Sequence, residues 1–145
     1  MDEINAGDYD QLTYEQIREF YPIEYKKRAE DKLGYRYPNG ESYIDLSLRV
    51  NESLKKLDFM TKENVYDNHS HFKGTILIEF CHQNFQKILS STFQKDHFLI
   101  CHQAVARCIL GILLNLPKEE IPHIEIPLHT VLKLENGKLS YEKII

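Results

Sequence analysis

The sequence predicts an α/β fold in a single domain, and three observations support this prediction. An apolar run, Phe98-Leu99-Ile100, is typical of a short buried strand, and a helical repeat of apolar residues follows it directly. A second β-rich run, Thr75 to Phe80, also precedes an amphipathic pattern. The pair Asn136-Gly137 between two further β-rich runs predicts a tight hairpin turn. Strands that alternate with helices in this way favour the α/β class.

Length and composition are those of one globular domain. The 145 residues carry a net charge of -4, which gives no reason to expect a nucleic acid or an anionic membrane as partner. No apolar run is long enough to cross a bilayer, and the N-terminus has no hydrophobic signal segment. Three cysteines are an odd number, unlike a secreted disulfide framework. We therefore expect a cytoplasmic protein.

The first helix is predicted by a capping box. Residues 1–7 show no helical or strand period, so a frayed terminus and a functional loop are alternatives there. Thr13 is followed three positions later by Gln16, a pair that caps a helix N-terminus. The helix is expected to begin near Tyr14.

A second helix is predicted from about Ile23 to Asp31 or Lys32, after a break at Pro22. Arg28 and Lys32 stand four positions apart, which would place both side chains on one helix face. A solvated charged face is the alternative interpretation of this pair.

The third helix follows a turn. Pro38-Asn39-Gly40 combines a fixed φ with residues that tolerate a positive φ. Ser42 is a favourable N-cap residue. Apolar residues then recur at spacings of three and four, which predicts an amphipathic helix of about four turns. These residues are Tyr43, Leu46, Val50, Leu54 and Leu57.

The central part of the chain is less regular. Positions 58–71 are polar and mixed, which predicts a surface loop. Another amphipathic helix is predicted from Phe85 to Phe93. Cys-His-Gln occurs at 81–83 and again at 101–103, but two short matches do not support a repeat array.

The C-terminal part contains the helix after the 98–100 strand, which is expected to end near Leu114. Pro122 and Pro127 favour an extended stretch beyond it. The two strands of the hairpin are predicted at 129–134 and 138–143.

The junction at His102 is the strongest local signal for a site. His102 and Gln103 stand where the predicted strand ends and the helix begins, the place where open α/β sheets bind ligands. Unpaired N–H groups of a helix N-terminus favour an anion. Arg107, five positions after His102, would add a bidentate guanidinium. A packed helix with a satisfied histidine and a surface arginine is the alternative.

Other chemistries find little support in the sequence. No Cys-x-x-Cys or His-x-x-x-His pair occurs, and His69 and His71 have no second pair nearby, so neither a metal nor another cofactor is expected. Cys101 and His102 are neighbours on a strand and would point to opposite faces, which disfavours a nucleophilic pair. No glycine-rich phosphate loop is present.

Several cationic, hydroxyl and amide side chains suit a multiply charged phosphate ester, provided that the fold brings them together. The set comprises Tyr14, Arg28, Lys32, Tyr43, Gln103 and Arg107, together with His102.

Longer motifs reveal a family resemblance. The runs 31–43, which contains Tyr35-Arg36-Tyr37-Pro38-Asn39-Gly40-Glu41-Ser42-Tyr43, and 101–108, Cys-His-Gln-Ala-Val-Ala-Arg-Cys, are the most specific. The chain resembles the bisphosphatase domain of 6-phosphofructo-2-kinase/fructose-2,6-bisphosphatase, a branch of the histidine phosphatase (phosphoglycerate mutase-like) superfamily. Further matching positions are 2–7, 12–15, Arg28 and 126–134.

The resemblance implies a phosphoglycerate mutase-like three-layer sandwich. Relative to the family, the chain lacks the first strand, and positions from about 55 to 95 form an extra segment of the single partial domain. Loss of that strand would leave unpaired backbone groups beside the strand that ends at His102. Our hypothesis is that Thr75 to Phe80 pairs with Phe98 to Cys101 and covers part of this gap.

The resemblance also implies an activity, the hydrolysis of fructose 2,6-bisphosphate to fructose 6-phosphate and phosphate through a phosphohistidine. Glu3 would protonate the departing sugar oxygen and then activate water. His102 would hold the phosphoryl oxygens. The fructose 6-phosphate part would be bound by Tyr14, Arg28, Lys32, Tyr43, Gln103 and Arg107.

The sequence departs from the family in one respect. The family's nucleophile lies in an Arg-His-Gly motif, and no such triplet occurs among the 145 residues. Both His82 and His102 stand in a Cys-His-Gln context instead. We therefore expect the acid, the second histidine and the sugar-phosphate contacts without the nucleophile, on a chain that a kinase domain or other N-terminal portion would complete.

The motifs are compatible with three functions. The first is a phosphatase represented by an incomplete domain, and the second is a non-catalytic pseudo-phosphatase that binds a sugar phosphate. The third is a structural remnant. A homodimer is left open as well.

Overall fold

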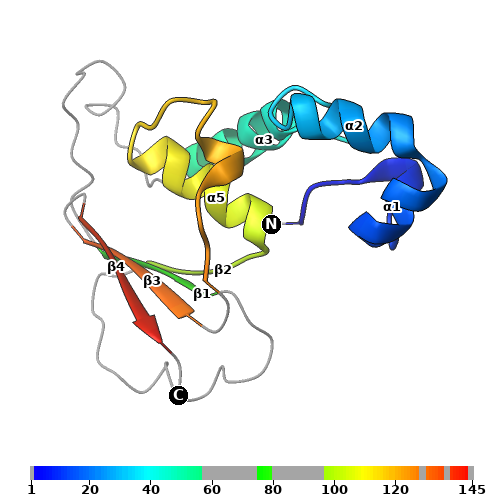
Figure 1. Cartoon of the computed structure of the whole chain (residues 1–145). Coiled ribbons are helices and arrows are strands. Elements are labelled where there is room, and N and C mark those ends of the chain that lie inside the picture. The colour runs from blue at the N-terminus through cyan, green and yellow to red at the C-terminus, as the bar shows by residue number, and fades with distance from the viewer. Residues whose placement is uncertain (1, 57–74, 80–96, 128–129, 136–137, 144–145) are drawn as a thin grey trace.

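The computed structural model describes residues 2–56, 75–79, 97–127, 130–135 and 138–143, and Figure 1 shows their arrangement. The elements in chain order are η1 (Gly7–Tyr9), α1 (Tyr14–Phe20), α2 (Pro22–Glu30), α3 (Tyr43–Lys56), β1 (Thr75–Glu79), β2 (His97–Ile100), α5 (Gln103–Leu113), η3 (Ile121–His123), β3 (Thr130–Glu135) and β4 (Lys138–Lys143). The predicted loop at 58–71 and the predicted helix at 85–93 lie outside the described residues.

The strands form one sheet in the order β2-β1-β3-β4. β1 and β2 are parallel, with Leu77 opposite Phe98, so the predicted pairing of these two runs is confirmed. β1 also pairs with β3 in the antiparallel sense. β3 and β4 form the predicted hairpin, with Leu132 opposite Tyr141. The predicted turn residues at 136–137 lie outside the described part of the chain.

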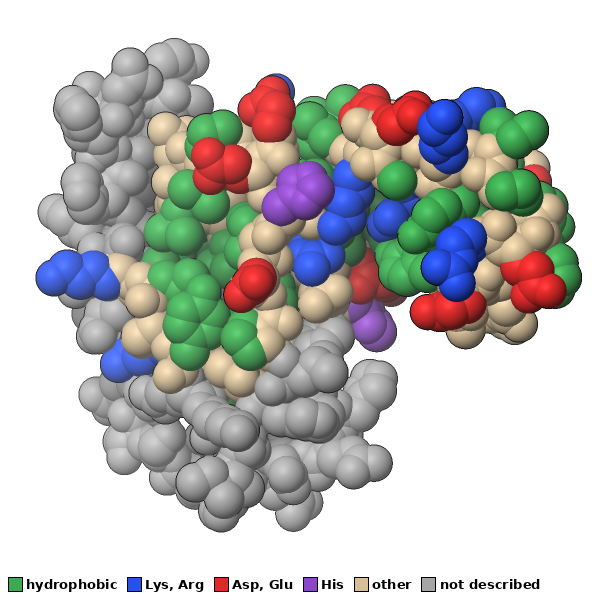
Figure 2. All heavy atoms as spheres, viewed as in Figure 1, with side chains coloured by type: hydrophobic (Ala, Val, Ile, Leu, Met, Phe, Trp, Pro, Cys, Tyr) green, Lys and Arg blue, Asp and Glu red, His purple; other side chains and the backbone are tan. Residues whose placement is uncertain are grey.

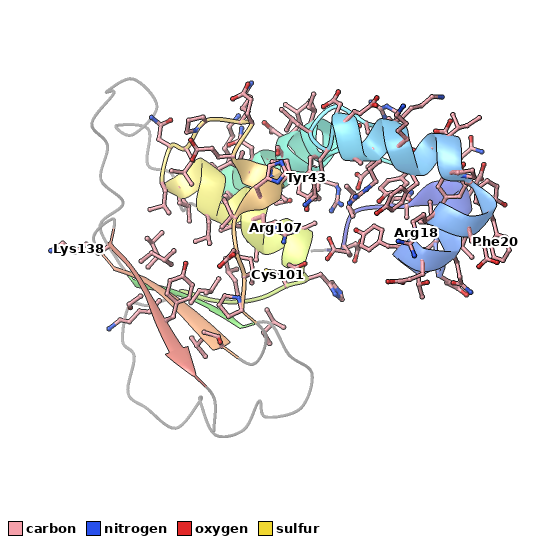
Figure 3. The ribbon with its side chains drawn as sticks, in the orientation of Figure 1. Arg18, Phe20, Tyr43, Cys101, Arg107 and Lys138 are labelled. Atoms are coloured by element: carbon pink, nitrogen blue, oxygen red, sulfur yellow. The ribbon has the colours of Figure 1, made fainter. Side chains whose placement is uncertain are left out.

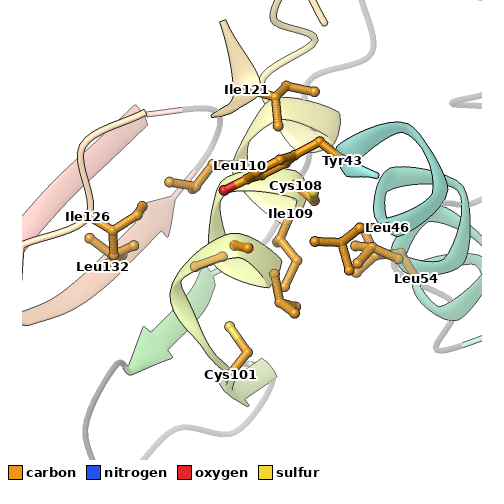
Figure 4. Packing of buried hydrophobic residues seen from close by; sticks show 14 of the residues in the cluster. Tyr43, Leu46, Leu54, Cys101, Cys108, Ile109, Leu110, Ile121, Ile126 and Leu132 are labelled. Atoms are coloured by element: carbon orange, nitrogen blue, oxygen red, sulfur yellow. The ribbon is translucent and has the colours of Figure 1, made fainter. Parts of the chain in front are cut away.

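The main hydrophobic core lies between the sheet, α5 and α3 (Figures 1 and 4). Leu132 and Leu134 alternate along β3 with Lys133, and both leucines are fully buried. Ile109 of α5 and Leu46 of α3 are buried in the same cluster. This packing fixes the N-terminus of α5 relative to the sheet and to α3.

One burial prediction for β2 is wrong. The run Phe98-Leu99-Ile100 is not buried throughout, because Ile100 is 43% exposed. Successive strand residues point to opposite faces, so only every second side chain can meet the helix layer. Leu99 packs against the main core, and Ile100 follows it on the other face.

The predicted helix starts are confirmed at α1 and α3. The Thr13 hydroxyl accepts a hydrogen bond from the Gln16 amide at 3.2 Å, and the Gln16 side chain accepts one from the Thr13 amide at 2.8 Å. Ser42 caps α3 in the same way through Asp45, whose carboxylate accepts from the Ser42 amide at 2.8 Å. Both helices begin where their caps satisfy the first N–H groups.

The second helix ends earlier than both predicted ends, Asp31 and Lys32. α2 stops at Glu30, and Asp31 adopts a non-helical φ of −135°. The Asp31 carboxylate accepts a hydrogen bond from the Gly34 amide at 2.8 Å, which stabilises a turn in place of a further helical turn. Lys32 therefore lies just beyond the helix that carries Arg28, and the two do not share a helix face.

The N-terminal segment lies against the turn at 37–41. Gly7 adopts a φ of +55°, and a side chain at Gly7 would collide with the carbonyl of Pro38. The Glu41 amide donates to the carbonyl of Asn5 at 2.8 Å, and the Asp8 amide donates to that of Pro38 at 3.0 Å. These contacts hold residues 5–8 in place, so the frayed terminus is wrong for this part of the segment, and the functional loop stays a prediction.

α1 and α2 lie on the far side of α3 and α5 from the sheet (Figure 1). A small second cluster of Tyr9, Ile17 and Tyr37 anchors them, and α2 itself contains no buried residue. Among the described helices, none has the length and apolar character needed to span a membrane.

Candidate functional site

A cavity of about 310 Å³ lies where α1, α2 and α5 meet. Its walls come from the consecutive helices α1 and α2, from the residues just after α2, and from α5, which is distant in the sequence; no acidic side chain is among the lining residues. They are Tyr14, Tyr25, Arg28, Ala29, Lys32, Gln103 and Arg107. Figure 2 shows Lys and Arg side chains gathered near the middle of this face of the molecule.

Arg28 is held among tyrosine side chains. Its Nη2 donates to the Tyr14 hydroxyl at 2.9 Å. The guanidinium carbon also lies 4.7 Å from the centre of the Tyr14 ring and 5.6 Å from that of Tyr37, within the range of cation–π attraction. Burial raises the pKa of Tyr37 to about 12, so this ring keeps its hydroxyl proton at neutral pH. The two rings thus orient the Arg28 guanidinium toward the cavity.

Three donors of the cavity wall are anchored to backbone carbonyls of residues 122–126, which we call the carbonyl strap and which run from η3 into the non-helical residues after it. The anchored carbonyls belong to every second residue of the strap. The bonds run from Lys32 Nζ to Pro122 (2.7 Å), from Arg107 Nε to Ile124 (2.8 Å) and from Gln103 Nε2 to Ile126 (3.4 Å).

Arg107 has a second anchor. Its Nη1 donates to the hydroxyl of Tyr43 at 3.1 Å, and Figure 3 shows the two side chains close together. Tyr43 is buried, and it is not among the residues that line the cavity. The structure therefore places Tyr43 behind Arg107, as a support for the guanidinium.

The cavity has a positive electrostatic character. Burial and the neighbouring charges of Arg107 and Arg28 lower the pKa of Lys32 from its ordinary value. Within the described ranges, no carboxylate lies at ion-pair distance from any of these three cations. Cations grouped without acidic partners are what a site for a multiply charged anion requires.

Glu3 lies at the N-terminus of α5. Its Oε1 accepts a hydrogen bond from the Ile4 amide at 2.8 Å, and its Oε2 accepts one from the Ala104 amide at 3.3 Å. His102 is the N-cap residue of this helix and is exposed. A carboxylate is favoured at this end of a helix by the free N–H groups and the helix dipole. The carboxylate is thereby placed close to His102.

Cys101 is buried beside this junction. Burial and the nearby Glu3 carboxylate raise the pKa of its thiol to about 12. A thiol with such a pKa stays protonated at neutral pH, which makes it a poor nucleophile.

The structure thus distributes the predicted site residues over two adjacent places. Glu3 and His102 stand at the start of α5, and Gln103 connects this place to the cavity wall. Tyr43 stands behind the wall. The other four predicted residues, Tyr14, Arg28, Lys32 and Arg107, line the cavity.

Sequence reasoning missed four contributors. Tyr25 stands three positions before Arg28 and four before Ala29, so a helical-face count from Arg28 to Tyr25 and on to Ala29 would have found both. Arg49 and Glu41 hold the Glu3 segment through non-local contacts, for which the sequence offered no spacing signal.

The chain belongs to the histidine phosphatase superfamily, branch 1, as the motifs predicted. Residues 1–71 match this family directly. Among relatives, the chain is 40% identical over 134 residues, or 92% of its length, to 6-phosphofructo-2-kinase/fructose-2,6-bisphosphatase 3 of Homo sapiens. It is 37% identical over the same length to 6-phosphofructo-2-kinase/fructose-2,6-bisphosphatase 1 of Homo sapiens. The chain spans only about a fifth of these relatives, 19% and 21% respectively.

Solved structures support the fold. The alpha-ribazole phosphatase of Shigella flexneri superposes with a TM-score of 0.58 at 14% identity, over 98% of this chain and 56% of that one. A protein of Escherichia coli superposes with a TM-score of 0.59 at 13% identity and the same coverage. At such identities the similarity shows the histidine phosphatase fold alone.

Proposed function

We propose that this chain provides the sugar-phosphate site of a fructose-2,6-bisphosphatase domain. The observation that supports this best is the cavity lined by Arg28, Lys32 and Arg107 without an acidic residue, next to a carboxylate and a histidine at one helix N-terminus. A ligand with two phosphates and a polar sugar matches both the charge and the available donors.

In this proposal the cavity binds the fructose 6-phosphate part, and the 2-phosphoryl group lies at the start of α5. Glu3 protonates the departing sugar oxygen and afterwards activates the water that attacks the phosphohistidine. His102 donates to the phosphoryl oxygens as negative charge develops on them. The 145 residues contain no Arg-His-Gly triplet, so the nucleophilic histidine has to come from outside them.

The proposal extends to the setting of the domain. The names of the relatives join a kinase and a bisphosphatase, and we propose a kinase region as a covalent or bound companion of this chain in the cytoplasm. We also propose that the described sheet and helices belong to a three-layer sandwich in which 55–95 is an extra segment.

A pseudo-phosphatase that binds a sugar phosphate without turnover is the second candidate, and the missing triplet favours it. Phosphate release from fructose 2,6-bisphosphate, by the chain joined to an added N-terminal segment that carries an Arg-His-Gly motif, distinguishes the two. Release supports the enzyme, whereas saturable binding of fructose 6-phosphate without release supports the pseudo-phosphatase.

Calorimetric titration with fructose 6-phosphate tests the site that both candidates share. Arg28→Gln and Arg107→Gln should each weaken binding on the order of tenfold, because each removes a charge-assisted hydrogen bond. Arg18→Gln is the matched control, since this exposed arginine lies on α1 outside the cavity (Figure 3). Equal affinities for all three variants would refute the site.

A further inference from the structure

Arg49 connects three separate parts of the molecule. It lies on α3, and its guanidinium forms a two-pronged bond with the Glu41 carboxylate, Nε to Oε1 and Nη2 to Oε2, both at 2.9 Å. The side chains of both residues are largely shielded, with 34% and 21% exposed. The Arg49 guanidinium holds the pKa of Glu41 below its ordinary value. This geometry is the strong form of an arginine–carboxylate pair.

The same guanidinium reaches the Glu3 segment. Nη1 donates to the backbone carbonyl of Asp2 at 3.1 Å, and Nη2 donates to that of Glu3 at 3.3 Å. A lysine could not form all of these bonds, because its ammonium is a single point charge. Arg49 therefore fixes the peptide groups on both sides of the Glu3 α-carbon.

Glu41 holds the other end of this segment. Its Oε2 accepts a hydrogen bond from the Asn5 amide at 3.1 Å, and its own amide donates to the Asn5 carbonyl at 2.8 Å. The pair thus restrains the backbone from residue 2 to residue 5. The Glu3 carboxylate therefore extends from a restrained backbone to the Ala104 amide, with which it forms a hydrogen bond.

We propose that Arg49, with Glu41, is a positioning residue that holds the Glu3 carboxylate at the N-terminus of α5. The importance of this role rests on the proposed function, in which Glu3 transfers a proton and has to stand at one fixed place relative to His102. A misplacement of about 1 Å at such a group is costly for catalysis. Arg49 itself lies outside the cavity and touches none of its lining residues through a described hydrogen bond.

Amide hydrogen exchange at Ala104, measured by NMR on the whole chain, tests this role. Ala104 lies in the first turn of α5, where an amide has no acceptor within its own helix. Its protection therefore reports the bond to Glu3, and Glu3→Ala gives the unprotected value. Leu110, in the middle of α5, reports the stability of the helix.

Arg49→Lys should reduce the protection of Ala104 on the order of tenfold and leave that of Leu110 unchanged, because only the Glu3 bond is lost. Arg36→Lys is the matched control. It alters the other described arginine–carboxylate pair that involves α3, Arg36–Asp45, and should change neither amide. Unchanged protection of Ala104 in folded Arg49→Lys, or an equal loss at both amides, would overturn the proposal.

Glu41→Gln is the second variant, used if Arg49→Lys does not fold. It should reduce the exchange protection of the Ala104 amide by less than about tenfold and leave that of Leu110 unchanged. Failure of both variants to fold would make the pair a stability element and also overturn the proposal. Calorimetric titration with inorganic phosphate keeps the two hypotheses apart. Arg49→Lys should bind phosphate like the unaltered chain, and absence of binding by the unaltered chain would count against the proposed function alone.

Discussion

Lys32 donates a hydrogen bond from its Nζ to the carbonyl oxygen of Pro122 at 2.7 Å, although 90 positions separate the two residues in the sequence. The bond connects the end of the α2 segment to the carbonyl strap, which also anchors Arg107. Two cations of the cavity are thus positioned by the same stretch of backbone.

The first prediction concerns the electrostatic coupling of these cations. Arg107→Gln should raise the pKa of Lys32 toward its ordinary value, because the Arg107 charge is one of the causes of its lowering. NMR titration of ¹³C-labelled lysine side chains measures this pKa. Arg18→Gln serves as the control and should leave it unchanged, and an unchanged value in Arg107→Gln would refute the coupling.

The second prediction follows for stability. The pKa of Lys32 is lower in the folded chain than its ordinary value of 10.5, so the unfolded chain binds more protons between these two values. The free energy of unfolding should therefore gain a contribution from Lys32 as pH rises through this window, and this contribution is absent below the folded pKa.

Denaturant titration of the unaltered chain and of Lys32→Met, at several pH values up to 10.5, isolates this contribution. Tyr37, whose raised pKa works in the opposite sense, is common to both chains and cancels in the difference. A difference in the free energy of unfolding that does not change with pH would contradict the prediction.

The third prediction concerns the support of Arg107. Tyr43→Phe removes the hydroxyl that accepts from Arg107 Nη1, and should lower the free energy of unfolding by about 1–2 kcal/mol. Tyr141→Phe is the control, because Tyr141 is 50% exposed and should be close to neutral. Equal stability of the two variants would show that the Tyr43 hydroxyl adds nothing.

The fourth prediction links the core to the cavity. A side chain at Gly111 of α5 would meet Ile121, whose Cδ1 would lie 2.7 Å away, and Ile121 directly precedes the strap. Gly111→Ala should therefore cost about 1–3 kcal/mol of stability through overpacking. It should also weaken fructose 6-phosphate binding, because displacement of the strap moves the anchors of Lys32 and Arg107.

A double-mutant cycle with Ile121→Ala checks this explanation. Because the second change removes the clashing atoms, the double variant should be more stable than the sum of the two single effects predicts. Additive effects would mean that Gly111 and Ile121 are not in steric conflict.

The fifth prediction separates local stability from binding. Thr13→Ala removes the side-chain cap of α1 and should cost about 1 kcal/mol by thermal or chemical denaturation. Thr13→Ser retains the hydroxyl and should be nearly neutral. A loss in Thr13→Ser as large as that in Thr13→Ala would assign the effect to something other than the cap.

Features determined by neighbouring residues could be predicted from the sequence. The caps at Thr13 and Ser42 and the β3–β4 hairpin depend on contacts within a few positions, and all three were found. The early end of α2 was harder to foresee. The helix stops because the Asp31 carboxylate accepts a hydrogen bond from the Gly34 amide, and this turn replaces a further helical turn.

The residues of the candidate site were predicted from the family motifs. The contacts that hold these residues in position could not be predicted from the sequence. The motifs named Arg28 and Arg107 but not what holds them. The strap binds through backbone carbonyls, which every amino acid has, so no sequence pattern indicates which residues serve as anchors. Arg49 escaped notice since its partners stand eight and 46 positions away, beyond any helical spacing rule.

The strap holds the cavity residues through main-chain oxygens. Its exposed side chains therefore take no part in anchoring Lys32 or Arg107. His123 and Glu125 alternate with the anchoring residues and are both exposed. Replacements there would change the surface charge on the strap while the backbone carbonyls that hold Lys32 and Arg107 remain. The charge of the strap surface can therefore change independently of the geometry of the cavity wall.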